Sequence, residues 1–340
     1  MSVKDRWDIR GQPAAVHMLR NALRTGRLAH AYLFVGPKGV GKATTAEMVA
    51  AGVVCEAGDP AQRPCGECPA CVDVAARRHV DVFWVEPEGD KILIDQVRAL
   101  QQQTMLKAVR GRCKVFLVEA VDTATEQAQN ALLKVLEEPP GETVLILIAH
   151  NETPLLPTIV SRCVVVRFGP LPKDVAAGIL RERFGYGDAA ELGGALGDGS
   201  IEAATRLSPE ELLQRRRAAL DFFAELRRSD ITAAPRLAES WNKRRDELVE
   251  MLDILQIWLR DVLLVQHRPD ALREPETWLV NVDLKGELER WAAAMAPDAV
   301  LAALEHVLAF RRRLADNVGL RSLVDVLFVD LAACGRPVVA

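Results

Sequence analysis

The chain has 340 residues, of which 49% are hydrophobic and 26% are charged. This length predicts two or three domains, and the composition excludes a fibrous or disordered protein. The 43 Lys and Arg residues against 47 Asp and Glu residues give a net charge of −4, which provides no general attraction to nucleic-acid backbones. Any contact with nucleic acid is therefore expected to be local. The longest apolar run, 144–149, is far shorter than the roughly 20 residues of a membrane span.

The cysteine count indicates the redox environment. The chain has seven cysteines, an odd number, and four of them lie between Cys55 and Cys71. Such bunching favours a metal site over disulfides and a reducing compartment over an oxidising one. The start of the sequence has no basic-then-apolar leader. We therefore expect a cytoplasmic protein without a membrane partner.

The first 168 residues alternate short apolar runs with amphipathic segments, which is typical of a parallel sheet covered by helices on both faces. The apolar runs are nearly continuous, as expected for strands buried on both sides. The predicted strands are 31–35, 82–85, 114–118, 143–148 and 164–168, and the predicted helices are 14–24, 45–51, 95–103 and 125–138. The fold class over residues 1–169 is therefore α/β with a parallel sheet.

The strand pattern ends at the Gly-Pro-Leu-Pro run 169–172, because proline removes a backbone donor and the spacing of apolar residues then becomes helical. A small helical domain is predicted over 170–207. Ser208 is a predicted N-cap, with Pro209 at the first helical position. An all-helical domain is predicted over 208–340.

The sharpest local pattern is the glycine-rich run 36–43, which follows a predicted strand and opens a helix, as a phosphate-binding loop requires. Its glycines let successive backbone N–H groups point at an anion, and the helix N-terminus adds a favourable dipole. Lys42 would then reach the terminal phosphates. The predicted nucleotide-binding residues are Gly36, Lys38, Gly39, Gly41, Lys42 and Thr44 around the loop, together with Glu119 at the end of the strand 114–118. An ordinary glycine-rich turn is the alternative.

Two positions differ from those of an active ATPase. The eighth loop position should carry the hydroxyl that binds magnesium, but it is Ala43. Thr44 is a poor substitute, because one residue along a helix rotates the side chain by about a quarter turn or more. The strand 114–118 should end in an Asp-Glu pair, but Glu119 is followed by Ala120, which has no base to offer. Magnesium is expected to be poorly held, and binding of ATP or ADP stays open.

The four bunched cysteines, Cys55, Cys65, Cys68 and Cys71, have the spacing C-x9-C-x2-C-x2-C. Two-residue gaps let neighbouring thiolates point at one tetrahedral ion. Four protein ligands leave no open position for a substrate, so structural zinc is the leading interpretation. Iron–sulfur ligation shares these residue types and is the alternative.

Three segments carry a family resemblance. Residues 28–34, 130–140 and 156–163 are similar to the AAA+ subunits of bacterial clamp loaders, and the resemblance is dense over 7–170. It implies an α/β nucleotide domain, a small helical lid and a helical collar that holds five subunits in a ring. It also implies a structural zinc module at the cysteine positions. The boundaries near 170 and 208 agree with this plan.

The resemblance also separates two kinds of subunit. The motor subunits, gamma or tau, are expected to keep the loop threonine, the Asp-Glu pair and an arginine in the lid. The corresponding residues here are Ala43, Glu119 with Ala120 and, from the alignment of 199–202, Glu202. These three losses favour a non-motor member without its own ATPase activity. The alternative is an active gamma- or tau-like ATPase.

The Ser161-Arg162-Cys163 motif is intact. In the family this arginine reaches across the subunit interface to the neighbour's ATP, where a guanidinium neutralises charge on the transferred phosphoryl group. The resemblance therefore implies that Arg162 is a catalytic residue that acts in trans. The implied partners are the gamma or tau and delta subunits, the sliding clamp and, through the assembled DNA polymerase III complex, primed template DNA.

The basic runs 215–217 and 311–313 invite a nucleic-acid interpretation. Both runs lie in helical sequence with acidic neighbours, which favours solvated helix faces or contacts within the helical domain. The net charge of −4 also disfavours a stand-alone DNA-binding protein.

Overall fold

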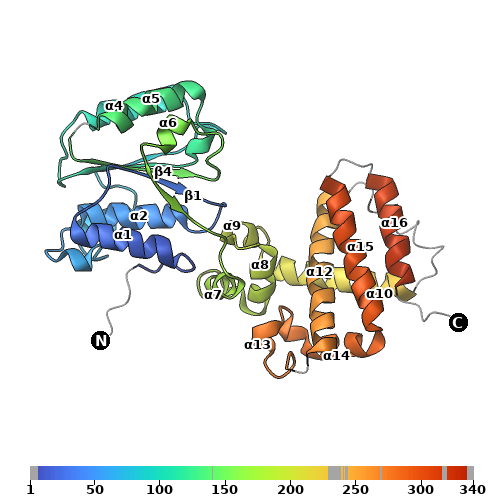
Figure 1. Cartoon of the computed structure of the whole chain (residues 1–340). Helices are drawn as coiled ribbons and strands as arrows, with labels where there is room; N and C mark the ends of the chain where they lie inside the picture. Colours follow the sequence, from blue (N-terminus) through green and yellow to red (C-terminus); the bar gives the residue numbers. More distant parts are fainter. Residues whose placement is uncertain are drawn as a thin grey trace. The chain divides into compact units, whose positions relative to one another are not determined.

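The computed structural model describes residues 7–139, 141–228, 239, 241, 244–268, 270–315 and 320–334. The chain divides into two compact units, Met1–Val175 and Ala176–Ala340 (Figure 1). Within the described ranges, no single helix has the length and apolarity to span a membrane. One pair, Val282–Ala294 with Pro297–Leu314, passes that test jointly but is bent by 109°.

The first unit contains all five predicted strands. They are β1 (Ala31–Val35), β2 (Val82–Val85), β3 (Lys114–Val118), β4 (Thr143–Ala149) and β5 (Val164–Arg167). They pair in parallel in the order β2-β3-β4-β1-β5, which confirms the fold class. Every strand was expected to be buried on both sides, but this holds only for β1, β3 and β4. β2 and β5 are partly exposed because they form the two edges.

Helices cover both faces of this sheet (Figure 1). They are α1 (Pro13–Thr25), α2 (Lys42–Val54), α3 (Pro69–Ala75), α4 (Ile94–Thr104), α5 (Glu126–Glu137) and α6 (Pro157–Val160), with short 3-10 turns η1 (Pro60–Gln62) and η2 (Val121–Thr123). Side chains of β1 alternate between the faces, so Phe34 packs in the cluster with α1 and α2, whereas Leu33 packs in the cluster with α4 and α5. The predicted helices are confirmed, with ends shifted by up to three residues.

The second unit is helical throughout its described residues. Its elements are α7 (Lys173–Phe184), η3 (Gly187–Ala189), α8 (Ala190–Leu196), α9 (Ile201–Ala204), α10 (Pro209–Arg228), α12 (Arg245–His267), α13 (Pro275–Trp278), η5 (Val282–Leu284), α14 (Lys285–Ala294), α15 (Pro297–Ala315) and α16 (Leu320–Ala333). Helix α10 begins at the predicted cap. The Ser208 hydroxyl accepts the Glu211 N–H at 3.2 Å, and the Glu211 carboxylate accepts the Ser208 N–H at 2.9 Å, a reciprocal capping box.

Two apolar clusters stabilise the second unit. The short helices α7 to α9 pack around Leu180 and Leu192 together with Leu212 of α10. The long helices α10, α12, α15 and α16 share a larger cluster that includes the fully buried Trp258 and Phe328. Each cluster excludes apolar surface from water, which is the main favourable term in folding.

The basic runs are part of this helical packing. Arg216 is 5% exposed, and its Nη1 donates to Asp283 at 2.8 Å. In the second run, Arg311 pairs with Asp253 at 2.6 Å. These ion pairs are contacts within the helical domain, which is one of the two expected roles of the runs.

Candidate functional site: the P-loop edge, Arg162 and the cysteine cluster

The run 36–43 connects β1 to α2, as a phosphate-binding loop requires. A Cβ on Gly36 would lie 2.1 Å from the carbonyl oxygen of Phe168, so no larger residue can replace it without moving the backbone. Gly39 and Gly41 have φ values of 69° and 95°, which glycine adopts without steric cost. The backbone therefore explains the glycine at all three positions.

Lys42 is the first residue of α2 and is 5% exposed. Its Nζ donates hydrogen bonds to the carbonyl oxygens of Gly36, at 2.6 Å, and Pro37, at 2.5 Å. The ammonium group thus lies inside the curl of the loop, where a phosphate would also be attracted. Lys38 is exposed in the loop itself.

The first turn of α2 lacks the hydroxyl of an active ATPase. Ala43 presents a methyl group, and Thr44 is exposed. Thr45 is buried, and its hydroxyl donates to the Gly41 carbonyl oxygen at 2.7 Å. The Thr45 hydroxyl therefore serves the helix backbone and does not replace the missing magnesium ligand.

The acidic end of β3 is paired with a cation from the same chain. Arg77 Nη2 lies 3.4 Å from Glu119 Oε1 and 3.0 Å from Glu47 Oε1, and Nη1 pairs with Glu86. Burial raises the pKa of Glu119, and the charge of Arg77 opposes this rise. Glu47 lies one helical turn beyond Ala43, so both residues occupy one face of α2. A guanidinium thus neutralises carboxylates close to the position where an ATPase would use a metal.

Arg77→Ala is expected to lower the free energy of unfolding by about 1–2 kcal/mol at neutral pH, because three carboxylates lose a shared cation. The loss should shrink as the pH falls towards about 4, since protonated carboxyls no longer repel one another. Urea unfolding at both pH values measures it. Arg78→Ala is the matched control, because Arg78 forms an exposed pair with Asp73 at 2.8 Å and should cost under about 0.5 kcal/mol. Equal losses for both variants would contradict the role of Arg77.

A second polar pair lies where β4 ends. Asp122 Oδ2 accepts the backbone N–H of His150 at 3.1 Å and that of Asn151 at 3.3 Å, and it is 3.4 Å from His150 Nδ1. Burial lowers the pKa of His150, and the positive charges of Lys42 and Lys38 lower it further, against the opposing effect of Asp122. The His150 ring therefore belongs to the electrostatic environment of the loop. No sequence motif indicated this pair, although the carboxyl ends of parallel strands share one edge.

Arg162 follows α6 and does not join these groups through any hydrogen bond or ion pair within the described residues. Its Nη2 lies 2.7 Å from Glu137 Oε1, and its Nη1 donates to the Thr158 carbonyl oxygen at 3.0 Å. Its side chain is 35% exposed. Arg162 is therefore oriented by its own chain and stays accessible to solvent.

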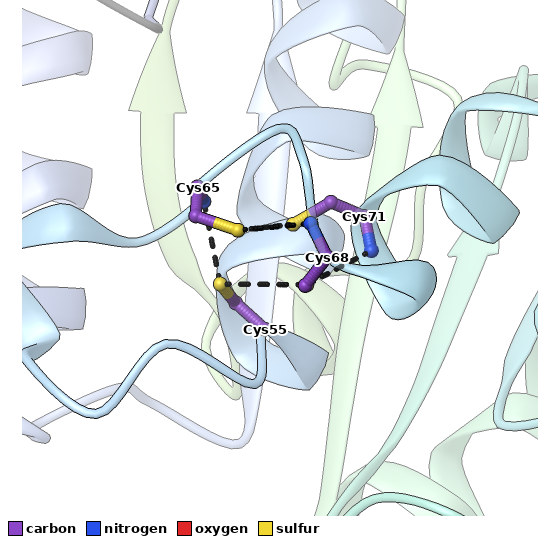
Figure 2. Close-up of side chains that lie close together, drawn as sticks. All are labelled: Cys55, Cys65, Cys68 and Cys71. Atoms are coloured by element: carbon purple, nitrogen blue, oxygen red, sulfur yellow. Dashed lines mark hydrogen bonds between the residues drawn. The ribbon is translucent and has the colours of Figure 1, made fainter.

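The four cysteines of the predicted metal site meet in space, with the Sγ atoms within 4.8 Å of one another (Figure 2). Cys55 Sγ is 4.0 Å from Cys68 Sγ, and Cys65 Sγ is 4.0 Å from Cys71 Sγ. Zinc–sulfur bonds of about 2.3 Å in a tetrahedron require sulfur atoms about 3.8 Å apart. The four thiols therefore have the number and the spacing that a tetrahedral ion needs.

Backbone N–H groups also point at these sulfur atoms. Cys55 Sγ accepts the N–H of Cys65 at 3.3 Å, and Cys65 Sγ accepts that of Cys68 at 3.2 Å. Burial acts to raise the pKa of Cys65, but N–H donors bring it down to about 7. Burial raises the pKa of Cys71. Metal binding must therefore displace protons, so its affinity falls in acid.

The parallel sheet, the glycine-rich loop at its carboxyl edge and the helices on both faces define an α/β protein of the P-loop type. Residues 11–172 match a family model described as DNA polymerase III, delta subunit, and residues 210–322 match the model of its C-terminal part. Subunit delta' of DNA polymerase III from Pseudomonas aeruginosa is 36% identical over 91% of this chain and 93% of that protein. The delta' subunit of Bacillus subtilis is 29% identical over 94% of this chain and 96% of its own length. The chain belongs to the family of DNA polymerase III delta' subunits.

The tau and gamma relatives match less of the chain. The tau subunit of Escherichia coli is 40% identical, but the match covers only 46% of this chain and 24% of that protein. The delta' relatives, in contrast, match along nearly the whole length. The prediction that the chain is a delta' subunit, and not a gamma or tau subunit, is therefore confirmed.

Proposed function

We propose that the chain is the non-motor subunit of a five-subunit clamp loader and assists the ATP-dependent loading of the sliding clamp onto primed DNA. Its partners are the gamma or tau and delta subunits, and it meets the clamp and DNA through the assembled complex. The observation that carries this proposal is the combination of an accessible Arg162 with Ala43 and Ala120 at the two positions that hydrolysis needs. Arg162 supplies the positive charge to ATP bound by a neighbouring motor subunit.

Within the chain itself, the P-loop edge is proposed to bind nucleotide weakly or to act as a structural remnant. Backbone N–H groups of the loop and the Lys42 ammonium attract phosphate. Glu119, the remaining acidic residue, is engaged by Arg77 at 3.4 Å. These features support poor magnesium binding and no ATP turnover by the isolated chain.

The isolated chain is expected to hydrolyse ATP at least about 10²-fold more slowly than a gamma or tau motor, because it lacks both a general base and the magnesium hydroxyl. Equilibrium binding of ATP and ADP comes first, and a steady-state ATPase assay follows. Lys42→Ala is the control and should leave the residual rate unchanged. Brisk magnesium-dependent hydrolysis that Lys42→Ala abolishes would instead support the alternative of a motor ATPase.

The cysteine cluster is proposed to hold one structural zinc ion. Four converging sulfur atoms support this choice, because a closed all-thiolate site is typical of structural zinc. The ion would supply a crosslink between α2, which ends beside Cys55, and α3, which contains Cys71. An iron–sulfur cluster is the alternative, and metal analysis separates the two.

Three domains are proposed: the P-loop domain over 1–169, a lid over 170–207 and a collar over 208–340. The apolar cluster centred on α7 to α9, which also includes Leu212 and Val280 of the proposed collar, supports the lid. The two family matches, 11–172 and 210–322, leave residues 173–209 between them, which overlap most of the proposed lid. Within the proposed collar, residues 229–238, 240, 242–243, 269, 316–319 and 335–340 lie outside the described residues.

A further inference from the structure

A concave surface of the first unit is separate from the P-loop edge and from Arg162. It is a groove of about 450 Å³ between α1 and the segment that links Cys55 to Cys65. The groove is lined by Pro13, Val16, His17, Arg20, Asn21, Arg24, Pro60, Ala61 and Arg63. Nothing in the proposed function uses this surface.

One wall of the groove is a single face of α1. Residues 13, 16, 17, 20, 21 and 24 recur at three- and four-residue spacing, so their side chains lie along the same side of the helix. The opposite face carries Leu19 and Leu23, which are buried in the apolar cluster. Val16 also packs partly against that cluster, whereas His17, Arg20 and Arg24 are exposed on the groove side.

The other wall is held in place by hydrogen bonds. Asp59 accepts the Ala61 N–H at 2.9 Å and so caps η1. Arg63 Nε donates to the Ala57 carbonyl oxygen at 2.8 Å, and Trp7 Nε1 donates to the Arg63 carbonyl oxygen at 3.4 Å. This segment lies between Cys55 and Cys65 of the cysteine cluster. The shape of the wall therefore depends on the cysteine module, which is the segment 55–71 with its four cysteines.

The lining has a strongly one-sided charge. Arg20, Arg24 and Arg63 carry guanidinium groups, and none of the nine lining residues is acidic. Guanidinium groups pair with carboxylates through two parallel hydrogen bonds. The remaining surface includes apolar patches at Val16 and Ala61. The groove therefore favours an anionic ligand that also has apolar parts.

Two classes of anionic polymer meet the charge requirement, and the lining favours a peptide. Single-stranded nucleic acid is usually held by aromatic rings on which bases stack. The nine lining residues include no Phe, Tyr or Trp. A peptide with acidic and small apolar side chains satisfies both the arginines and the apolar patches, and arginine clusters recognise acidic motifs.

We propose that the groove between α1 and the cysteine module binds a short acidic peptide segment of a partner protein. Arg20, Arg24 and Arg63 pair with its carboxylates, and Val16 and Ala61 contact its apolar side chains. The cysteine module thereby gains a role beyond stability, because it forms one wall of a protein-binding surface. The proposal does not depend on the role of Arg162 or on ATP binding.

Fluorescence anisotropy of a labelled octapeptide of alternating Asp and Leu, titrated with the full chain, tests the proposal. The same peptide with Asn in place of Asp is the probe for charge and should bind at least about 10-fold more weakly. The double variant Arg20→Glu with Arg24→Glu is expected to weaken binding of the acidic peptide by at least about 10-fold. Both residues are exposed, and a melting temperature measured alongside separates loss of peptide binding from loss of folding.

Arg98→Glu is the matched control, because Arg98 is an exposed arginine of α4 whose side chain is 62% exposed. It should leave peptide binding unchanged. The proposal would be overturned if the acidic and neutral peptides bind with equal affinity. It would also be overturned if the double variant binds the acidic peptide as tightly as the unmodified chain does. A labelled single strand of eight thymidines is the second probe. If it binds more tightly than the acidic peptide and loses binding in the double variant, the occupant is nucleic acid and the peptide proposal is wrong.

Discussion

Arg162→Ala in the reconstituted complex is expected to lower ATP hydrolysis at the one neighbouring site that Arg162 serves by about 10³-fold or more. The reason is that charge developing on the transferred phosphoryl group loses its guanidinium. Assembly should be unaffected, because the Arg162 side chain is 35% exposed. Among the described residues, its guanidinium pairs with the Glu137 carboxylate and the Thr158 carbonyl oxygen, both on the surface. DNA-stimulated ATPase activity and clamp loading measure the first effect, and size-exclusion chromatography measures the second.

Two further variants separate charge, geometry and general surface effects. Arg162→Lys keeps the charge but loses the planar fork, so it should restore only part of the activity. Arg167→Ala removes an arginine that is five residues away, pairs with Glu152 and is 66% exposed, and it should leave the activity unchanged. Unchanged ATPase activity in Arg162→Ala would remove the proposed trans-acting role, while leaving family membership intact.

Cys68→Ser is expected to remove the bound zinc and to destabilise the first unit by about 4 kcal/mol or more, because loss of a structural metal is among the most damaging single changes. For a unit of this size, that loss corresponds to a fall in melting temperature of about 8–16 °C. Metal analysis and thermal unfolding measure the two effects. A chelator should produce the same fall in the unmodified chain and little further change in the variant.

Cys113→Ser is the control for this experiment. Cys113 lies outside the cluster, and burial raises the pKa of its thiol to about 11. The Cys113→Ser variant should therefore keep one zinc ion per chain. Metal analysis that finds iron and inorganic sulfide would favour the alternative cluster. A chain that binds no metal, with a melting temperature that Cys68→Ser does not change, would contradict any structural metal.

The strands and the cysteine cluster were predictable because local patterns define them. The run 31–35 and the residues 115–118 that follow Lys114 are nearly continuously apolar, and they form β1 and β3 with the predicted bounds 31–35 and 114–118. The short gaps among Cys65, Cys68 and Cys71 likewise confine their thiols to a small volume. Burial of β5 was predicted wrongly, since a run of valines does not reveal which strand lies at the edge of the sheet.

The electrostatic partners of the site were not predictable, because they are distant in the sequence. Arg77 meets Glu119 across 42 positions, and Asp122 meets His150 across 28. Neither pair belongs to a local motif, and only the parallel sheet brings the members together. The pairing of Arg162 with Glu137 is of the same kind, because it depends on α5 and α6 packing side by side.

Under the proposed function, the pair of Arg162 and Glu137 affects how easily the ring of subunits can open and close. Removing a bare guanidinium from a phosphate would leave a charge to be solvated again at every cycle. Glu137 instead offers Arg162 a carboxylate at 2.7 Å within its own chain. Under the proposed function, engagement with the neighbour exchanges one anionic partner for another, so the electrostatic free energies of the two states are kept close. Small differences in the bound nucleotide are then sufficient to shift the balance between the engaged and the disengaged subunit.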